Sequence, residues 1–446
     1  MKKLYSVIIC LLMCIPIVYA NFNSEEVKKD STNSAKKWEH TVYTDEVQKE
    51  NAKTSKLQIG GYGEATTHRF FYSDDFNRYK YPENYTSVPS RGQFDLPHVV
   101  FSISYNFGKG WSVSTEIEFE HGGTGSTIEI EDEEFGEYEQ EVEKGGEIVL
   151  EQFWIQKSFN KYINIRMGHI IVPIGITNQY HMPIEYFTVL RPEEETSILP
   201  VTWHEYGISL WGNAGKWSYN AMFLAGLDAE RFSDRGWIKD GAVSPYEFKI
   251  ANSYAGAFRV DYRAVEGLRI GLSGYYGLSA KNSLKNRYEE IYGDVLIGSL
   301  DATYNYNNVI ARGTFVYGHL WDSFEISRKN KNMSSNSPSP RTNVASGAMC
   351  YFVEAGYDIF SFFPKLEEQK FYIFGHFGYY HSMFNTVEGI LSDARFERHI
   401  ASAGINYYPL PQIVIKAEFS SRIFNSPYNN ENTISLGVMY TGMFNK

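Results

Sequence analysis

The sequence predicts an all-β fold, namely a transmembrane antiparallel β-barrel of about sixteen strands. Three observations lead to this prediction. Strand-length segments alternate apolar and polar residues, tight turns alternate with long connections, and the N-terminus carries the pattern of an export signal. A barrel that crosses the outer membrane has a lipid-facing and a water-facing side, short periplasmic turns and long extracellular loops. The predicted location is therefore the bacterial outer membrane.

The first twenty residues have the three parts of a secretory signal peptide. Lys2 and Lys3 give a positive start, residues 4–17 are mostly apolar, and Ala20 is the small residue that precedes cleavage. The alternative, a transmembrane anchor, needs about 20 apolar residues. We therefore predict cleavage near Ala20. Residues 21–56 are rich in charged and small polar side chains, which predicts a flexible periplasmic tail before a barrel over 57–446.

Charge and cysteine content narrow the function classes. The formal net charge is −11, and cleavage removes two further positive charges, so nucleic acid is not expected as a partner. Cleavage also removes Cys10 and Cys14, which leaves Cys350 alone. An intramolecular disulfide and a cysteine metal cluster are then impossible, and the sequence implies no cofactor. The mean hydropathy of −0.36 suits a barrel, because only every second strand residue faces lipid.

The alternation of apolar and polar residues is sharpest in three segments, 111–120, 268–273 and 413–420. A soluble β-sandwich would alternate as well, so a single strand does not discriminate between the two folds. The sixteen predicted strands are 57–72, 94–107, 111–121, 147–159, 162–172, 204–212, 216–226, 253–264, 268–279, 293–306, 309–320, 345–360, 370–381, 397–408, 412–424 and 432–444.

The connections favour the barrel over the sandwich. A long connection at 73–93 is followed by a short one at 108–110, and the rhythm repeats at 122–146 and 160–161. Aromatic residues make up 16% of the chain, and many lie near segment ends. They would suit the aromatic girdles of a membrane barrel, although strand propensity alone also explains them.

Four segments resemble the porins grouped with phosphate-selective porins O and P, in particular their Bacteroidetes relatives. These are Asn106–Trp111, Ser114–Gly123, Leu150–Trp154 and Trp203–Gly212. The resemblance implies a water-filled channel for passive diffusion of small polar or charged solutes, including anions such as phosphate, and no enzymatic activity. It also implies a homotrimer surrounded by outer-membrane lipid and lipopolysaccharide.

The connection 173–203 is the candidate constriction loop, because general porins fold their third long loop into the barrel. Its prolines limit chain flexibility, and Arg191 beside three glutamates offers a transverse field that would filter solutes by charge. An external lid with solvated charges is the alternative. The candidate residues are His181, Glu185, Arg191, Glu193, Glu194, Glu195, Trp203 and His204.

Strand parity predicts a set of charged side chains that face the lumen. In a barrel of this size they would be hydrated and would tune selectivity, although cross-strand ion pairs are an equally good explanation. The set comprises Glu116, Glu118, Glu120, Arg166, Arg259, Arg263, Arg269, Arg312, Lys416 and Arg422, together with Asp261, Asp301, Arg398 and Glu418.

Two long connections are predicted to be surface loops. Residues 129–147 hold ten carboxylates and one lysine, so this segment should repel itself and extend into solvent. It lacks the spacing of a calcium-binding loop, and no metal site is predicted. Residues 322–344 are rich in Lys, Asn, Ser and Pro and predict a flexible surface loop.

Two other function classes remain as alternatives. A barrel hydrolase would use a histidine, and the candidates are His121, His169, His204, His376 and His381, but no G-x-S-x-G nucleophile pattern is present. An adhesin or receptor would use the long loops of the same architecture as a binding surface.

Overall fold

The computed structural model describes residues 56–87, 91–123, 126–132, 138–144, 146–200, 202–244, 248–283, 290–334, 339–366 and 368–444. The predicted signal peptide (1–20), and the predicted tail (21–56) except for its last residue, lie outside these residues. Among the described residues, no helix has the length and apolar character needed to cross a lipid bilayer.

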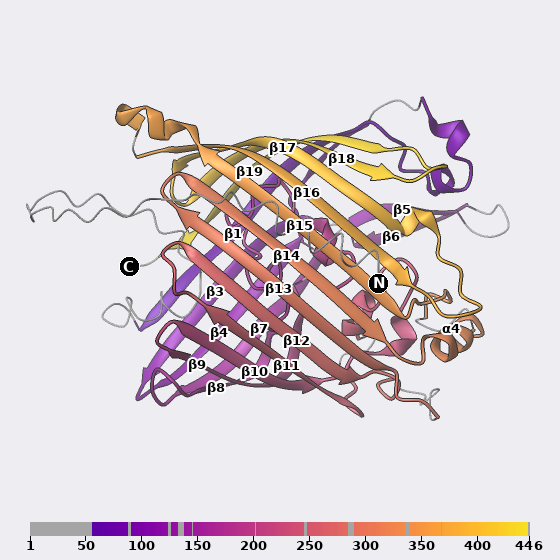
Figure 1. Cartoon of the computed structure of the whole chain (residues 1–446), viewed down its shortest axis with the longest axis horizontal. Coiled ribbons are helices and arrows are strands. Elements are labelled where there is room, and N and C mark those ends of the chain that lie inside the picture. Colours follow the sequence, from indigo (N-terminus) through magenta and orange to yellow (C-terminus); the bar gives the residue numbers. More distant parts are fainter. Residues whose placement is uncertain are drawn as a thin grey trace, which may run out of the picture. The chain divides into compact units, whose positions relative to one another are not determined.

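The chain forms a closed antiparallel β-barrel (Figure 1), as the sequence predicts. The strand segments of the ring are β1 (Leu57–Phe70), β2 (Arg91–Asp95), β3 (His98–Gly108), β4 (Trp111–Glu120), β7 (Glu147–Ser158), β8 (Asn164–Ile171), β9 (His204–Ala214), β10 (Trp217–Ala225), β11 (Tyr254–Tyr262), β12 (Leu268–Leu278), β13 (Asp294–Tyr306), β14 (Val309–Leu320), β15 (Gly347–Asp358), β16 (Lys370–Asn385), β17 (Glu397–Leu410), β18 (Ile413–Phe424) and β19 (Glu431–Met443). The ring closes where β1 pairs with β19, from Gly60 opposite Met443 to Phe70 opposite Thr433.

The strands β2 and β3 occupy one position in the ring, because both pair with β1. The barrel therefore has sixteen strand positions, and the predicted number is confirmed. Leu96 and Pro97 separate the two pieces, and proline cannot donate a backbone hydrogen bond to the ladder.

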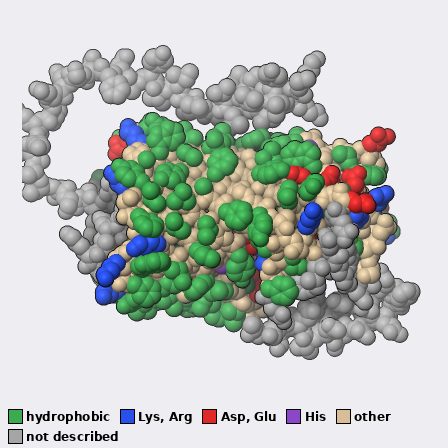
Figure 2. Space-filling view, turned by 90° about the horizontal axis from the view of Figure 1, so that it is seen from below, with side chains coloured by type: hydrophobic (Ala, Val, Ile, Leu, Met, Phe, Trp, Pro, Cys, Tyr) green, Lys and Arg blue, Asp and Glu red, His purple; other side chains and the backbone are tan. Residues whose placement is uncertain are grey.

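Alternation places apolar side chains outside and polar ones inside. Ile415 and Phe419 on β18 are exposed on the outer face, whereas Lys416 between them is fully buried. Figure 2 shows hydrophobic side chains over much of the outer surface of the barrel. The outer face thus has the character that a lipid environment requires.

The connections differ between the two ends of the barrel. One end carries residues 109–110, 159–163, 215–216, 263–267, 307–308, 359–369 and 411–412, which we call the turn end. The other end carries 71–90, 121–146, 172–203, 226–253, 279–293, 321–346, 386–396 and 425–430, which we call the loop end.

Two predicted surface loops differ from expectation. Within 321–346, the described residues include helix α4 (Ser323–Lys331), whose Ile326 and Asn330 are buried. The amide nitrogen of Asn330 donates to the carbonyl oxygen of Ala229 at 3.2 Å, which joins α4 to the connection 226–253. The prediction of a flexible surface loop is therefore wrong for this part. Within the acidic run, β5 (Ser126–Asp132) and β6 (Tyr138–Lys144) pair as a separate hairpin, because cross-strand pairing satisfies the backbone even in a charged segment.

The loop end contains an apolar core inside the ring. Phe232 and Trp237 from the connection 226–253 pack with Ile326 and with inward residues of the wall. The indole nitrogen of Trp237 donates to the carbonyl oxygen of Ala345 at 3.1 Å. A Cβ atom on Gly318 of β14 would overlap the Trp237 ring, so this glycine allows the close approach. Part of the barrel interior is consequently filled by its own connections.

Candidate functional site

The connection 172–203 lies within the ring of strands and is held by inward side chains of the wall. The Lys416 ammonium nitrogen donates to the carbonyl oxygens of Pro183, Tyr186 and Thr188 at 2.6, 2.7 and 2.8 Å. Lys416 is on β18 and has no exposed surface. One wall lysine therefore fixes three backbone groups of the loop.

Three more wall residues bind the same stretch of loop backbone. Phe187 donates its N–H to Glu354 at 3.2 Å and accepts from Asn406 at 3.1 Å. Val189 donates its N–H to Glu418 at 2.6 Å. These bonds come from β15, β17 and β18, so one sector of the wall holds the loop across its width.

The three consecutive glutamates of the loop point in different directions. Glu193 and Glu194 bind the wall: Glu193 pairs with Arg422 at 2.6 Å, and Glu194 lies 2.8 Å from the Nε2 atom of His376. Glu195 folds back and accepts from the N–H groups of residues 176, 177 and 178. Burial opposes ionisation of Glu193, but the charges of Arg422 and Arg398 outweigh it and lower its pKa. Burial raises the pKa of Glu195 to about 7, against the bonds that it accepts.

Arg191 is turned away from these glutamates. Its Nη1 atom donates to Thr202 at 2.5 Å, and its Nη2 atom lies 3.3 Å from the Tyr62 hydroxyl and 3.9 Å from Glu118. The local field between Arg191 and Glu193–Glu195 that the sequence suggests is therefore not formed. Arg191 faces the acidic side of the wall instead.

The remaining candidates from the loop occupy separate places. Trp203 is buried in the apolar core, with its ring 4.9 Å from that of Tyr275. His204 begins β9 and packs against His169 of β8, with ring centres 4.3 Å apart. His181 and Glu185, in contrast, lie on the part of the loop inside the lumen.

An acidic strip runs along the inner wall where β1, β3, β4 and β7 adjoin. We define this acidic strip by the carboxylates of Glu64, Glu116, Glu118, Glu120 and Glu151. One carboxylate oxygen on each of Glu64, Glu118 and Glu151 is buried and accepts no hydrogen bond. Part of the hydrogen-bonding capacity of the acidic strip is therefore not used.

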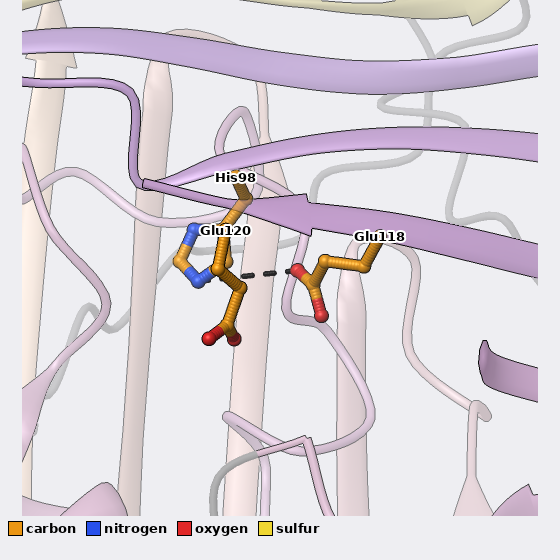
Figure 3. A group of neighbouring side chains, drawn as sticks. All are labelled: His98, Glu118 and Glu120. Carbon is orange, nitrogen blue, oxygen red and sulfur yellow. Dashed lines mark ion pairs between the residues drawn. The ribbon is translucent and has the colours of Figure 1, made fainter. Parts of the chain in front are cut away.

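Two histidines contact the acidic strip. His98 of β3 is hydrogen-bonded to Glu64 through Nδ1, and its Nε2 atom lies 3.9 Å from Glu118 (Figure 3). The Nε2 atom of His181, from the loop, lies 3.8 Å from Glu151. Burial, followed by the nearby charge of Arg191, lowers the pKa of His181 to about 3. His181 is thus neutral at physiological pH and brings no positive charge to the acidic strip.

Three of the arginines predicted to face the lumen are paired with carboxylates. Asp301 accepts from Arg259 at 2.9 Å and forms an ion pair with the Nη2 atom of Arg269 at 2.8 Å, and both arginines also bind Asp261. Arg312 is bound to Glu354. All three arginines are buried. For these three arginines the structure shows the ion-pair alternative, with carboxylates of neighbouring or nearby strands and, for Arg259, also with Asp261 of its own strand.

The other predicted lumen charges are more open. Arg166 is half-buried, donates to Gln156 at 2.9 Å, and lies over the Trp154 ring at 4.3 Å. Arg263 lies just beyond β11, is exposed at the turn end, and donates to Ser218 at 2.7 Å. Arg398 donates to the Tyr380 hydroxyl at 2.6 Å.

Two cavities open below the loop at the turn end. One of about 390 Å³ lies between residues 180–187 of the loop and the ends of β11–β14. Glu185 lines it, and burial raises the pKa of this carboxyl to about 7. The other, of about 410 Å³, is lined by β1, β3, β4 and β7–β9. The first cavity is therefore bounded by the loop, whereas the second is lined by strand ends and turns.

The histidines considered for hydrolysis are held in other arrangements. His376 lies between Glu194 and Glu354, and His121 pairs with Asp95 at 2.9 Å. His381 lies 3.1 Å from the Ser392 hydroxyl. Within the part of the chain that the structure describes, no carboxylate or amide is hydrogen-bonded to the second ring nitrogen of His381. A complete triad of the serine-hydrolase type is therefore not formed around these described histidines.

Sequence reasoning missed several residues of the site. Glu64, Glu151 and Glu354 face the interior of the barrel. The alternation of inward and outward residues along their strands could have identified them. His98 follows Pro97 at the interruption between β2 and β3, where parity gives no guide. Its partners became apparent only through the pairing of β3 with β4 and β1.

Comparisons with known proteins agree with the fold. No model of a known protein family matches the chain. An uncharacterized protein of Aquifex aeolicus is 24% identical over 378 residues, which cover 84% of this chain and 78% of the relative. The structure of Salmonella typhi OmpF in complex with daunomycin is similar with a TM-score of 0.52 at 10% identity, covering 86% of this chain and 97% of that one. The anion-selective porin from Comamonas acidovorans gives a TM-score of 0.48 at 10% identity, with coverages of 86% and 99%. The likeness to OmpF shows a shared barrel fold.

Proposed function

We propose that this barrel is an outer-membrane channel for passive diffusion of small polar or charged solutes, in which residues 172–203 form the constriction. The observation that carries the proposal is the attachment of this loop to the inner wall through Lys416, Glu418 and Asn406. A loop fixed inside a barrel of this size narrows the path through it. The fold shared with OmpF, named above, supports the same function.

We further propose that the channel prefers cations. The arginines Arg259, Arg269 and Arg312 are each paired with carboxylates, so they leave little positive charge for a passing anion. The acidic strip places five carboxyl groups on the inner wall, and Arg191 lies 3.9 Å from one of them, Glu118. Charged groups that line a narrow pore select ions of the opposite sign. Phosphate selectivity, which the family resemblance implies, is the competing proposal.

The membrane environment and the oligomeric state of the channel are proposed from its apolar outer face and from its resemblance to porins. An apolar belt of strand side chains suits outer-membrane lipid and lipopolysaccharide, and cleavage near Ala20 would accompany export. A homotrimer is proposed from the resemblance to porins. Mass spectrometry of the protein extracted from outer membranes measures both the mature N-terminus and the number of subunits.

Planar-bilayer recording of the purified protein tests the channel and its selectivity together. We expect discrete conductance steps and, in a KCl gradient, a reversal potential of the sign that K⁺ permeation produces. A reversal potential of the opposite sign, with a current reduced by added phosphate, would favour the anion proposal. Absence of any conductance from correctly folded protein would refute the channel.

A non-conducting receptor is the second candidate function. It is favoured by the apolar core at the loop end, where Trp237, Phe232 and α4 fill part of the interior. If the folded protein does not conduct, binding to cells or to matrix proteins through the loop-end connections becomes the activity to measure.

A further inference from the structure

We propose that His98, Glu118 and Glu120 form a binding site for a divalent transition-metal ion, and that Zn²⁺ is the ion they fit best. The three side chains lie together on the inner wall, His98 from β3 and the two glutamates from β4 (Figure 3). The strand register places His98 directly opposite Glu120, and Glu118 is two residues away on the same face. One ligand atom from each residue lies within 4.8 Å of the others.

The imidazole of His98 is oriented for metal binding. Its Nδ1 atom is hydrogen-bonded to the Glu64 carboxylate of β1, so Nε2 faces Glu118. A carboxylate that holds the distal nitrogen of a ligating histidine fixes the tautomer and raises the basicity of the other nitrogen. Glu64 is only 3% exposed, which keeps this hydrogen bond away from competing water.

Glu118 provides the independent evidence for a ligand. It is 4% exposed, and its Oε1 atom is buried without a hydrogen bond. Nitrogen atoms of His98 and Arg191 lie near this oxygen, but each is 3.9 Å away, beyond hydrogen-bonding distance. A buried carboxylate oxygen without a partner is costly. A metal ion between Glu118, Glu120 and His98 would supply the missing partner.

The donor set selects the class of ion. Imidazole nitrogen suits Zn²⁺ and other transition metals, whereas Ca²⁺ and Mg²⁺ prefer sites made of oxygen ligands. Three protein ligands plus water is a common arrangement for Zn²⁺. With metal–ligand bonds of about 2.0–2.2 Å, the donor atoms must move closer than their present separation. His98 and Glu120 are only half-buried, so their side chains have room to move and leave a route for the ion.

A second group of possible ligands makes the test specific. Glu116, Glu151 and His181 also have ligand atoms within 4.8 Å of one another. This group is less accessible, because Glu151 has no exposed surface and His181 is 8% exposed. Its histidine is oriented by the Asn178 carbonyl rather than by a carboxylate. We therefore assign the ion to His98, Glu118 and Glu120.

Equilibrium dialysis of the full folded protein in detergent against Zn²⁺ tests the site without any need for conduction. We expect bound Zn²⁺ that excess Ca²⁺ does not displace. His98→Asn and Glu118→Gln should lose one equivalent, and Glu64→Gln should weaken binding by about 10–100-fold. The matched variant His181→Asn should keep that equivalent.

Two results of the dialysis would overturn the assignment. No Zn²⁺ bound to the folded protein, or binding that is lost in His181→Asn and kept in His98→Asn, would overturn the assignment. If the buried Glu118→Gln variant does not fold, Glu120→Gln replaces it, since its side chain is half-buried, and it should weaken Zn²⁺ binding at least tenfold. Unchanged affinity in folded Glu120→Gln would also overturn the proposal. Because the experiment measures binding alone, failure of the channel proposal would not affect it.

Discussion

The Lys416 ammonium nitrogen lies 2.7 Å from the carbonyl oxygen of Tyr186 and 4.3 Å from the centre of the Tyr186 ring. The same nitrogen donates to two other carbonyl oxygens of the loop. All three donors of one buried ammonium group are therefore used to hold the loop to β18.

Replacing this lysine tests whether the loop restricts the pore. Lys416→Met removes the donor from three buried carbonyl groups, each of which costs about 1–3 kcal/mol when unsatisfied. We expect a lower thermal unfolding temperature, measured by circular dichroism, and a larger single-channel conductance. Lys365→Met, at an exposed position of the turn end, is the control. Reduced stability with unchanged conductance would show that the loop does not limit the current.

Phe187 rests against a glycine of the wall, and this contact gives a second prediction. A Cβ atom on Gly356 of β15 would overlap the Phe187 ring. Gly356→Ala should therefore displace the ring and lower the free energy of unfolding by about 1–3 kcal/mol. Gly298→Ala is the matched control, since a Cβ there meets nothing within 4 Å. Equal urea-unfolding midpoints for the two variants would contradict the packing described.

The pKa of Glu185, raised to about 7 by burial, predicts a pH-dependent stability. The carboxyl has a pKa near 4.5 in the unfolded chain, so the folded state holds its proton more tightly. The stabilisation from the neutral carboxyl is complete below pH 4.5 and is lost as pH rises through about 7. The pKa of Glu195 is also raised to about 7, so its contribution to stability falls over the same pH range, whereas the lowered pKa of His181 gives a contribution that falls as the pH decreases. The effect of Glu185 must therefore be measured as a difference between two proteins.

That difference is between the wild-type chain and Glu185→Gln. The gap in unfolding free energy between them should change with pH from 4.5 to 7, at a slope of up to about 1.4 kcal/mol per pH unit. Denaturant titrations at a series of pH values provide the measurement. Parallel stability curves for the two proteins would rule out the raised pKa.

Asp301 links two arginines, and its charge is the subject of a fourth prediction. It accepts from Arg259, forms an ion pair with Arg269 and is 2% exposed. Asp301→Asn should lower the free energy of unfolding by about 3–5 kcal/mol, because buried positive charge loses its partner. It should also shift the reversal potential toward anions. Asp294→Asn, half-buried on the same strand, should change neither quantity appreciably.

The sequence predicted the ring of strands well because lipid imposes a simple rule on every second residue. On β18, for example, Ile415 and Phe419 had to be apolar and Lys416 was free to be charged. The number of strand positions and their approximate limits followed. What the rule does not specify is how deeply an inward side chain is buried.

The pairing of charges depends on strand register, which the sequence does not reveal. Arg259 and Asp301 are 42 residues apart, and only the order β11–β12–β13 brings them together. Glu118 and His98 likewise meet only after β3 pairs with β4. Helix α4 was missed for another reason. Its serines and asparagine favour helices weakly, so contacts such as Asn330 with Ala229 help to stabilise it.

The pairing of β1 with β19 also determines when the fold can be completed. Gly60 and Met443 are partners, so the seam joins the two ends of the barrel sequence. Until β19 is available, β1 has an open edge, and open edges invite pairing with other chains. Such a distant contact forms late and slowly. The first strand must therefore be protected from aggregation through nearly the whole of assembly, which makes a cellular chaperone an expected requirement for biogenesis.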